Sequence, residues 1–239
     1  MNWWYPTLPP NASSFGGEID SLFYIILYIT GAVFFITEIA LVWFLLKYRH
    51  REGRKAVYIE GNTTAEIVWT AIPALIVVAL GLFSQPLWSR IKVDIPADAI
   101  PLRITGKQFE WHIKYPGPDG RLDTGDDFTR RGELHVVVNR TYSFALGSED
   151  VIHSFFIPVF RLKQDALPGT SIPGWFRATE TGQWEIACAE LCGLGHYRMR
   201  GRVWVHTQEE FDQWQASQAR PAAADTTATP PPPTRRRAP

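Results

Sequence analysis

One stretch of the sequence concentrates side chains that bind soft metal ions. Cys188, Cys192, His196 and Met199 fall within twelve residues, CAELCGLGHYRM, so two thiolates, an imidazole and a thioether share one loop. A second imidazole, His153, lies far upstream in the segment SEDVIHSFF. This mixture of soft donors suits copper better than calcium, magnesium or a structural zinc ion. The residue types therefore favour a copper site.

Two other interpretations of the cysteines stay open on residue types alone. Cys188 and Cys192 could form a small-loop disulfide if the domain lies outside the reducing compartment. They could also join two histidines in a zinc site, although the usual zinc spacings are different. A blue-copper site needs one cysteine, two histidines and a weak methionine ligand, so the second cysteine would be surplus there.

The region from about 90 to 215 supplies elements that could position these donors. Turn sequences such as PGPDG at 116–120 separate short β-rich stretches, and a helix is expected only at Gln208–Ala219. This pattern predicts an antiparallel sandwich or barrel, whose loops can gather at one end. The expected strands are Leu102–Thr105, Gln108–Lys114, Glu133–Val138, Tyr142–Leu146, Trp175–Ala178, Gln183–Ala187 and Val203–His206.

Two long apolar runs precede this region. Residues 21–46 contain Glu38 as their only formal charge, and residues 67–88 are uncharged with Pro73 near the start. Each run is long enough for a helix to cross a hydrocarbon core of about 30 Å. The loop between them begins with a basic cluster, which the positive-inside rule places in the cytoplasm, with both termini on the opposite side. The cluster consists of Lys47, Arg49, Arg51, Arg54 and Lys55.

Composition excludes several classes of protein. The 24 basic and 24 acidic side chains leave no basic excess for binding nucleic acid. Two cysteines are too few for a disulfide scaffold or a four-thiolate iron–sulfur site. We expect an exposed N-terminal segment over 1–20, a transmembrane hairpin over 21–90, a copper domain over 91–218, and a disordered Pro/Ala/Thr tail over 219–239.

Three motifs carry a resemblance to a known family. CAELCGLGHYRM, DVIHSFFIP and LKQDALPG together resemble the copper-A domain of subunit II of haem–copper cytochrome c oxidases, and EIVWTAIP at 66–73 resembles that family's second span. The resemblance covers about residues 20 to 215. It implies a two-helix transmembrane hairpin followed by an all-β cupredoxin-like Greek-key sandwich. It also implies that the chain accepts electrons from cytochrome c and passes them to haem in subunit I, for oxygen reduction coupled to proton translocation.

The resemblance implies a ligand set for a binuclear copper-A centre. The sulfurs of Cys188 and Cys192 would bridge the two copper ions. The remaining ligands would be His153 with Met199 for one ion, and His196 with the backbone carbonyl of Glu190 for the other.

Further roles follow from the same resemblance. The Glu190 side chain would bind a magnesium or manganese ion shared with subunit I. Glu66 matches a glutamate at the entrance of a proton pathway on the cytoplasmic side. Phe109 stands where the family commonly has a tryptophan that faces the electron donor, and Trp111 follows two residues later. Electrons are therefore expected to enter near Phe109 or Trp111.

The resemblance also suggests contact surfaces. The segment that holds Arg161 and Asp165 packs over the haem-bearing subunit in the family. An acidic surface for docking the donor is common there, and by position it could involve Glu110, Asp119 or Asp127.

The expected partners are oxidase subunit I, other oxidase subunits, the lipid membrane, and either a cytochrome c or a neighbouring respiratory complex. The chain has no Cys-X-X-Cys-His motif, so the haems are expected in subunit I and none on this chain. We expect the bacterial inner membrane rather than the mitochondrial one, with the copper domain on the periplasmic side. The alternatives are a membrane-anchored copper-binding or carrier protein and a quinol-oxidase-type subunit II, a type that has lost the copper ligands.

Overall fold

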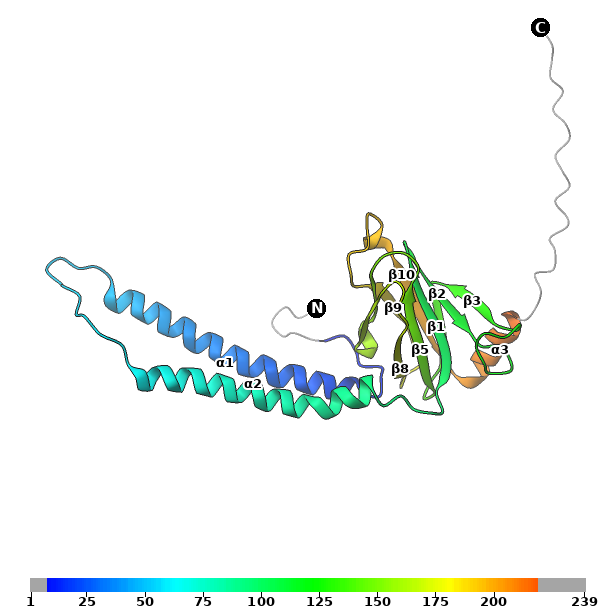
Figure 1. Cartoon of the computed structure of the whole chain (residues 1–239), viewed down its shortest axis with the longest axis horizontal. Helices are drawn as coiled ribbons and strands as arrows, with labels where there is room; N and C mark the ends of the chain where they lie inside the picture. Colours follow the sequence, from blue (N-terminus) through cyan, green and yellow to red (C-terminus); the bar gives the residue numbers. More distant parts are fainter. Residues whose placement is uncertain (1–7, 219–239) are drawn as a thin grey trace, which may run out of the picture.

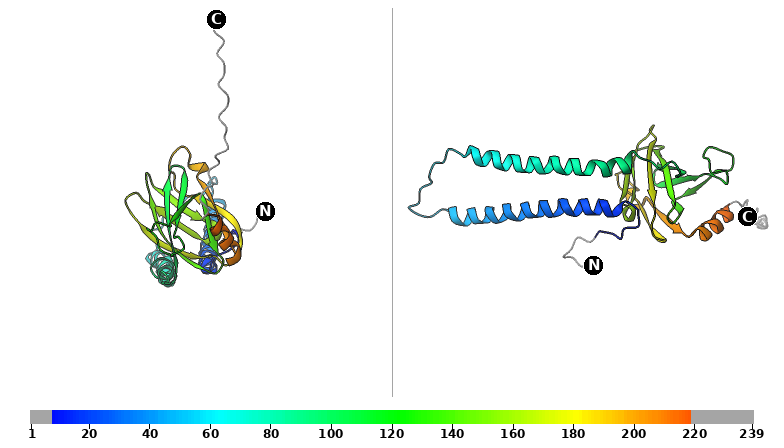
Figure 2. Two further views of the ribbon diagram at one scale, coloured as in Figure 1. Left: turned by 90° about the vertical axis from the view of Figure 1, so that its right-hand side faces the viewer. Right: turned by 90° about the horizontal axis from the view of Figure 1, so that it is seen from below.

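The computed structural model describes residues 8–218, which form a helical hairpin joined to a β-sandwich (Figure 1). The predicted disordered tail over 219–239 lies outside the described residues. The helices α1 (Gly16–Tyr48) and α2 (Thr63–Lys92) run side by side, as two perpendicular views show (Figures 1 and 2). Both are long and apolar enough to cross a membrane.

Both helices extend beyond the apolar runs that predicted them. Polar residues at their ends, such as Thr63 and Lys92, continue the helical backbone because only the middle of a span must be apolar. The side chain of Asn62 caps α2 by accepting a hydrogen bond of 3.0 Å from the Ala65 N–H. Pro73 and Pro86 lie inside α2 without ending it.

The sandwich consists of two five-stranded sheets, ordered β3-β2-β1-β5-β8 and β4-β10-β9-β6-β7. The predicted sandwich is confirmed and most neighbours are antiparallel, but β1 pairs with β5 and β4 pairs with β10 in parallel. Neither parallel pair joins consecutive strands, because the chain crosses between the sheets before each pair is completed. The strands are β1 (Ile100–Lys107), β2 (Glu110–Tyr115), β3 (Phe128–Arg131), β4 (Glu133–Val137), β5 (Thr141–Ser148), β6 (His153–Ile157), β7 (Leu162–Ala166), β8 (Ile172–Arg177), β9 (Gly182–Cys188) and β10 (Arg200–His206).

Three of these strands were missing from the prediction. β6 holds four of its five residues fully buried, so it lacks the alternation that marks a half-exposed strand. β3 and β7 are short and mostly polar. The short 3-10 helices Pro158–Phe160 and His196–Arg198 and the C-terminal helix α3 (Gln208–Gln218) complete the described elements.

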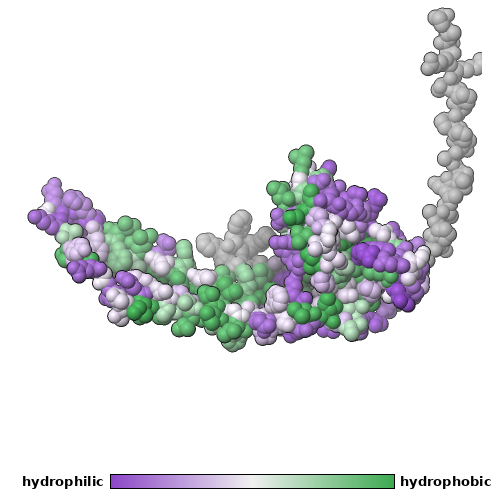
Figure 3. Space-filling model, viewed as in Figure 1, coloured by the Kyte–Doolittle hydropathy of each residue, from purple (hydrophilic) through white to green (hydrophobic). Residues whose placement is uncertain are grey.

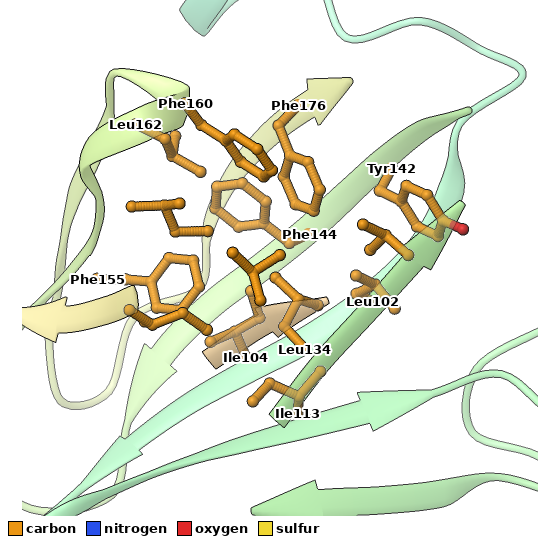
Figure 4. Close-up of a cluster of buried hydrophobic side chains, with 14 of the residues drawn as sticks. Leu102, Ile104, Ile113, Leu134, Tyr142, Phe144, Phe155, Phe160, Leu162 and Phe176 are labelled. Carbon is orange, nitrogen blue, oxygen red and sulfur yellow. The ribbon is translucent and has the colours of Figure 1, made fainter. Parts of the chain in front are cut away.

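Inward-facing side chains of both sheets fill the core. Leu102, Ile104 and Phe144 from one sheet meet Leu134 and Phe155 from the other (Figure 4). All five are almost inaccessible to water. This packing stabilises the sheets through burial of apolar surface and gives the loops at each end a rigid support.

Residues 8–15, which precede α1, pack against the sandwich, so this part of the N-terminal segment is not the exposed one expected. Ala12 and Phe15 belong to the buried core. The Ala12 N–H donates to Val159 O at 2.9 Å, and Thr179 N–H donates to Ala12 O at 3.0 Å. These bonds add an extended segment beside the sandwich and hold α1 against it.

A candidate metal centre at one end of the sandwich

Three segments bring the predicted metal donors to one end of the sandwich. His153 is the first residue of β6, and Cys188 is the last residue of β9. The loop from Ala189 to Met199 then projects from the sandwich before β10 begins (Figure 1). The pairing of Phe155 with Cys188 between β6 and β9 fixes the distant histidine beside the cysteine.

The two cysteine sulfurs lie at the middle of the donor cluster. Cys188 Sγ and Cys192 Sγ are 3.9 Å apart, and both residues are free cysteines. His153 Nδ1 lies 3.9 Å from Cys188 Sγ, and His196 Nδ1 lies 3.6 Å from Cys192 Sγ. Each imidazole therefore faces a different sulfur.

The other two predicted donors complete the cluster. Met199 Sδ lies 3.7 Å from Cys192 Sγ, and the backbone carbonyl oxygen of Glu190 lies 3.3 Å from Cys188 Sγ. The structure thus brings all six predicted donor atoms together around the sulfur pair.

These separations test the three chemistries that residue types left open. A disulfide needs its sulfurs about 2.05 Å apart, and the observed 3.9 Å does not meet this value. Two sulfurs that bind one ion at about 2.3 Å each can lie at most about 4.6 Å apart, so the pair can share a metal. A thioether and a backbone carbonyl are not usual zinc ligands, whereas soft sulfur donors select copper. The arrangement fits copper.

Burial isolates three of the six donor residues from water. His153, Cys192 and Met199 are buried, and His196 is half-buried. Burial and, to a smaller extent, the neighbouring Cys188 together raise the pKa of the Cys192 thiol to about 11. A bound cation reverses this effect, because metal coordination deprotonates a thiol. The site is therefore built for a cation that compensates two thiolates.

Asp150 is a site residue that the sequence interpretation missed. Its Oδ1 lies 2.8 Å from His153 Nε2, and its Oδ2 accepts a 2.7 Å hydrogen bond from the Gln108 N–H. Desolvation raises the pKa of Asp150, but the hydrogen bonds from Gln108, His153 and Val151 outweigh it and lower the pKa to about 2. An ionised carboxylate on Nε2 keeps the proton there and leaves Nδ1 free for a metal.

Gln108 links this carboxylate to the cysteine loop. Its side-chain Nε2 donates a 2.6 Å hydrogen bond to Cys192 O, while its N–H bonds Asp150. The turn between β1 and β2 therefore supports both ligand-bearing segments. A carboxylate three residues before a candidate histidine ligand was the available sequence signal for Asp150, whereas Gln108 offered none.

Phe109 and Trp111, the two aromatic residues expected where electrons enter, have different environments. Trp111 has no exposed surface, and its ring centroid lies 6.0 Å from that of His153. Phe109 is half-buried and lies directly against the loop, since a Cβ added to Gly195 would collide with its ring. Only Phe109 of these two reaches the surface of the loop.

The other predicted residues lie away from the donor cluster. Glu66 is exposed in the first turn of α2, at the end of the hairpin far from the sandwich (Figure 1). The Glu190 side chain is exposed. Asp165 accepts a 2.7 Å hydrogen bond from Ser154 Oγ, and Arg161 binds the carboxylate of Asp20 on α1. The Arg161 guanidinium therefore joins the sandwich to α1 within this chain.

The structure does not bring together the three acidic residues expected to form a docking surface. Glu110 begins β2 at the metal end, but Asp119 and Asp127 lie in the loop after Tyr115, at the other end of that strand. Six residues of strand separate these ends by about 20 Å. The Asp127 carboxylate also binds Lys114 Nζ at 2.7 Å.

Comparisons with known proteins agree with this architecture. The family model "Cytochrome C oxidase subunit II, transmembrane domain" matches residues 1–87, and "Cytochrome C oxidase subunit II, periplasmic domain" matches residues 126–204. The chain is 32% identical to the alternative cytochrome c oxidase subunit 2 of Bradyrhizobium diazoefficiens, over 90% of this chain and 84% of that protein. It is 33% identical to cytochrome c oxidase subunit 2 of Thermostichus vulcanus, over 87% and 77% of the two chains.

A solved structure is also similar. The periplasmic domain of subunit II of cytochrome oxidase (CoxB) of Bradyrhizobium japonicum is 31% identical, with a TM-score of 0.46. The match covers 52% of this chain and 96% of that one.

Proposed function

The chain belongs to the cytochrome c oxidase subunit II family and is a membrane-bound subunit of a haem–copper oxidase, and from this premise we propose that its six clustered donors hold a binuclear copper-A centre. The observation that carries the proposal is the 3.9 Å separation of Cys188 Sγ and Cys192 Sγ, with a further donor facing each sulfur. With copper bound, the chain would accept electrons from cytochrome c and deliver them to haem in subunit I for oxygen reduction.

The protein residues hold the site in one geometry. A copper pair held here would supply one-electron transfer, with the change in charge shared between two ions. Cys188 and Cys192 would hold both ions, His153 and Met199 would complete the ligands of one, and His196 with the Glu190 carbonyl would complete those of the other. Since His153 and Met199 are buried at the sandwich end, water has little access to them. A rigid, dry site keeps the geometry nearly unchanged between oxidation states.

The remaining residues connect the site to the rest of an oxidase. The exposed Glu190 carboxylate can bind a magnesium or manganese ion shared with subunit I. Glu66 lies on the cytoplasmic end of the hairpin, where a proton pathway into subunit I would begin. With the basic loop in the cytoplasm of a bacterial cell, the copper domain faces the periplasm.

Copper spectroscopy tests the proposal. The purified native oxidase complex should contain two coppers in this chain and give the multi-line EPR signal of a mixed-valent pair. The variant Cys188→Ser should lose that signal, whereas Ser143→Ala, within β5, should keep it. A single-copper spectrum or uptake of one copper per chain would contradict the binuclear centre.

Two alternative functions, a quinol oxidase subunit and a copper carrier, predict different experimental results. Quinol-oxidising relatives lack the copper ligands, whereas this chain retains all of them, so cytochrome c is the preferred donor. Turnover with ubiquinol but not with cytochrome c would reverse that choice. A copper carrier would purify without haem and would exchange copper readily with a partner protein.

A further inference from the structure

A glycine of β1 lies directly against the imidazole of His153. Gly106 is buried, and a Cβ atom added to it would lie 2.8 Å from His153 Cδ2 and 3.1 Å from His153 Cγ. His153 and its neighbour Trp111 have no exposed surface, so this contact lies beneath the outer surface of the sandwich that Figure 3 shows. The chain's own packing therefore decides where the imidazole can lie.

Polar groups already occupy both nitrogens of this imidazole. Asp150 Oδ1 lies 2.8 Å from Nε2, and Cys188 Sγ lies 3.9 Å from Nδ1. The backbone of His153 is also held, because this residue pairs with Ala166 at the start of β6. The ring atoms Cγ and Cδ2 face Gly106. A side chain at position 106 would therefore displace the ring from the position that serves both nitrogens.

Trp111 closes the remaining space beside this glycine. It is the residue opposite Gly106 in the pairing of β1 with β2, and its Cζ3 atom would lie 3.1 Å from the added Cβ. Its ring meets the imidazole of His153 edge to face, with centroids 6.0 Å apart and planes at 66°. Within residues 8–218, no group bonds the buried indole N–H of Trp111. The indole therefore contributes a packing surface here and not a hydrogen bond.

From this packing we infer that Gly106 is a positioning residue for His153, the proposed metal ligand. Together with Trp111, the bare backbone at this position sets the place of the imidazole between Asp150 and the sulfur pair. Carbon atoms in contact lie about 3.5–4.0 Å apart, so a methyl group on residue 106 would move the ring or β1 by at least about 0.7 Å. Ligands must be held within about 0.5 Å of their working geometry, so a shift of this size matters. The inference rests on the proposed copper-binding function and adds a residue outside the six donors that shapes the site.

The first test replaces Gly106 in the purified oxidase complex. After removal of its copper, Gly106→Ala should bind added copper about 10- to 100-fold more weakly than the unaltered complex, in competition with a copper chelator. The EPR spectrum of the copper that does bind should differ from that of the unaltered complex, because the imidazole has moved. The free energy of unfolding of each chain shows how much of the change comes from the fold.

Gly174→Ala is the matched control. Gly174 is a buried glycine of β8 in the same sheet, and a Cβ added to it would collide with the Phe144 ring in the core. This variant should lower the free energy of unfolding but change the copper affinity less than about twofold, because distant sites act independently. Its EPR spectrum should match that of the unaltered complex.

A second substitution tests whether crowding is the cause. Trp111→Phe removes the Cζ3 atom and breaks no hydrogen bond, so the methyl group added by Gly106→Ala gains room to move away from His153. The double variant should recover about tenfold of the lost copper affinity, whereas Trp111→Phe alone should change it less than about threefold. Where Gly106→Ala alone does not assemble into the complex, restored assembly and copper binding in the double variant would support the inference, and failure to restore either would contradict it.

The results separate this inference from the proposed function. Unchanged copper affinity in Gly106→Ala, equal losses in Gly106→Ala and Gly174→Ala, or no recovery in the double variant would each overturn the positioning role. Uptake of one copper in place of two by the unaltered complex would overturn the binuclear centre, while weaker binding in Gly106→Ala than in Gly174→Ala would still support the place assigned to His153. A complex that takes up no copper would overturn both.

Discussion

The Nε2 atom of His153 lies 2.8 Å from Oδ1 of Asp150, and its Nδ1 atom faces Cys188 Sγ at 3.9 Å. One imidazole thus joins a carboxylate on one side to the sulfur cluster on the other. Because the carboxylate holds the Nε2 proton, it selects the tautomer that can bind a metal through Nδ1. Asp150 therefore positions the ligand His153 and is not itself a ligand.

Replacing Asp150 with asparagine tests this role. Asp150→Asn should weaken copper retention by about 10- to 100-fold, because an amide fixes the tautomer less strongly than a carboxylate. Competition with a copper chelator measures the change, and the EPR signal reports the altered geometry. Glu149→Gln is the matched control, since Glu149 is half-exposed and pairs only with Lys107. Equal copper retention in both variants would contradict the positioning role.

Copper binding should release protons and tighten as pH rises. With burial raising the pKa of the Cys192 thiol to about 11, this thiol is protonated at neutral pH before copper binds. The metal must displace that proton, so affinity rises by up to about tenfold per pH unit for each proton released. Copper titration of the metal-depleted protein between about pH 6 and pH 8 measures this slope. A copper affinity that does not vary with pH would be inconsistent with a buried protonated thiol.

Fold stability should fall in mild acid because of a buried histidine on the outer face of β4. His135 Nδ1 lies 2.9 Å from His206 Nε2, and its ring stacks on Trp214 of α3 with centroids 4.1 Å apart. Burial, with smaller contributions from His206 and Arg130, lowers the pKa of His135 from 6.5 to about 4. The unfolded chain therefore binds a proton more readily than the folded chain between these values.

Acid destabilises the fold because the pKa of His135 is lower in the folded chain than in the unfolded chain. The stability contribution is fully present above about pH 6.5 and is lost as pH falls toward about 4, with a loss of up to about 3 kcal/mol. Denaturant unfolding at several pH values measures it. His135→Phe keeps an aromatic ring against Trp214 and should flatten the profile in this window. If His135→Phe lost stability with falling pH as steeply as the unaltered protein, the acid sensitivity would belong to other groups.

Local sequence patterns predicted the donor loop, whereas the residues that support it were not predictable. Four of the side-chain donors lie in one twelve-residue stretch, so their types and spacing were enough. His153 joins them through the pairing of β6 with β9, which only the family resemblance could anticipate. Gln108 and Asp150 are 42 residues apart, and their hydrogen bond depends on how three strand ends meet.

The packing of the N-terminal segment was likewise not predictable from the sequence. Residues 8–15 have neither helical nor strand periodicity, so their packing against the 3-10 helix Pro158–Phe160 and the end of β8 left no signal in the sequence. Phe15 nevertheless lies in the core against Trp175, with ring centroids 5.4 Å apart. The apolar spans were predictable because lipid requires a long uncharged run, but their polar ends were not.

The contact between Arg161 and Asp20 should anchor α1 to the sandwich. Arg161 Nε and Nη2 donate to the two carboxylate oxygens of Asp20 at 2.6 and 2.9 Å, and Nη2 also donates to Pro9 O at 2.6 Å. Arg161→Gln leaves the Asp20 carboxylate without its partner in a largely buried place. Loss of one member of such a pair costs on the order of 3 kcal/mol.

Hydrogen exchange of residues 8–20 and the free energy of unfolding measure the effect of Arg161→Gln. Exchange should speed up in this segment while the donor loop stays protected, because the loop lies at another end of the sandwich. Arg90→Gln is the matched control. Arg90 of α2 contacts Glu18 of α1, the helix that also holds Asp20, but this pair is half-exposed and is worth at most about 1 kcal/mol. If both variants destabilised the protein equally, the Arg161–Asp20 pair would have no special part in fixing α1.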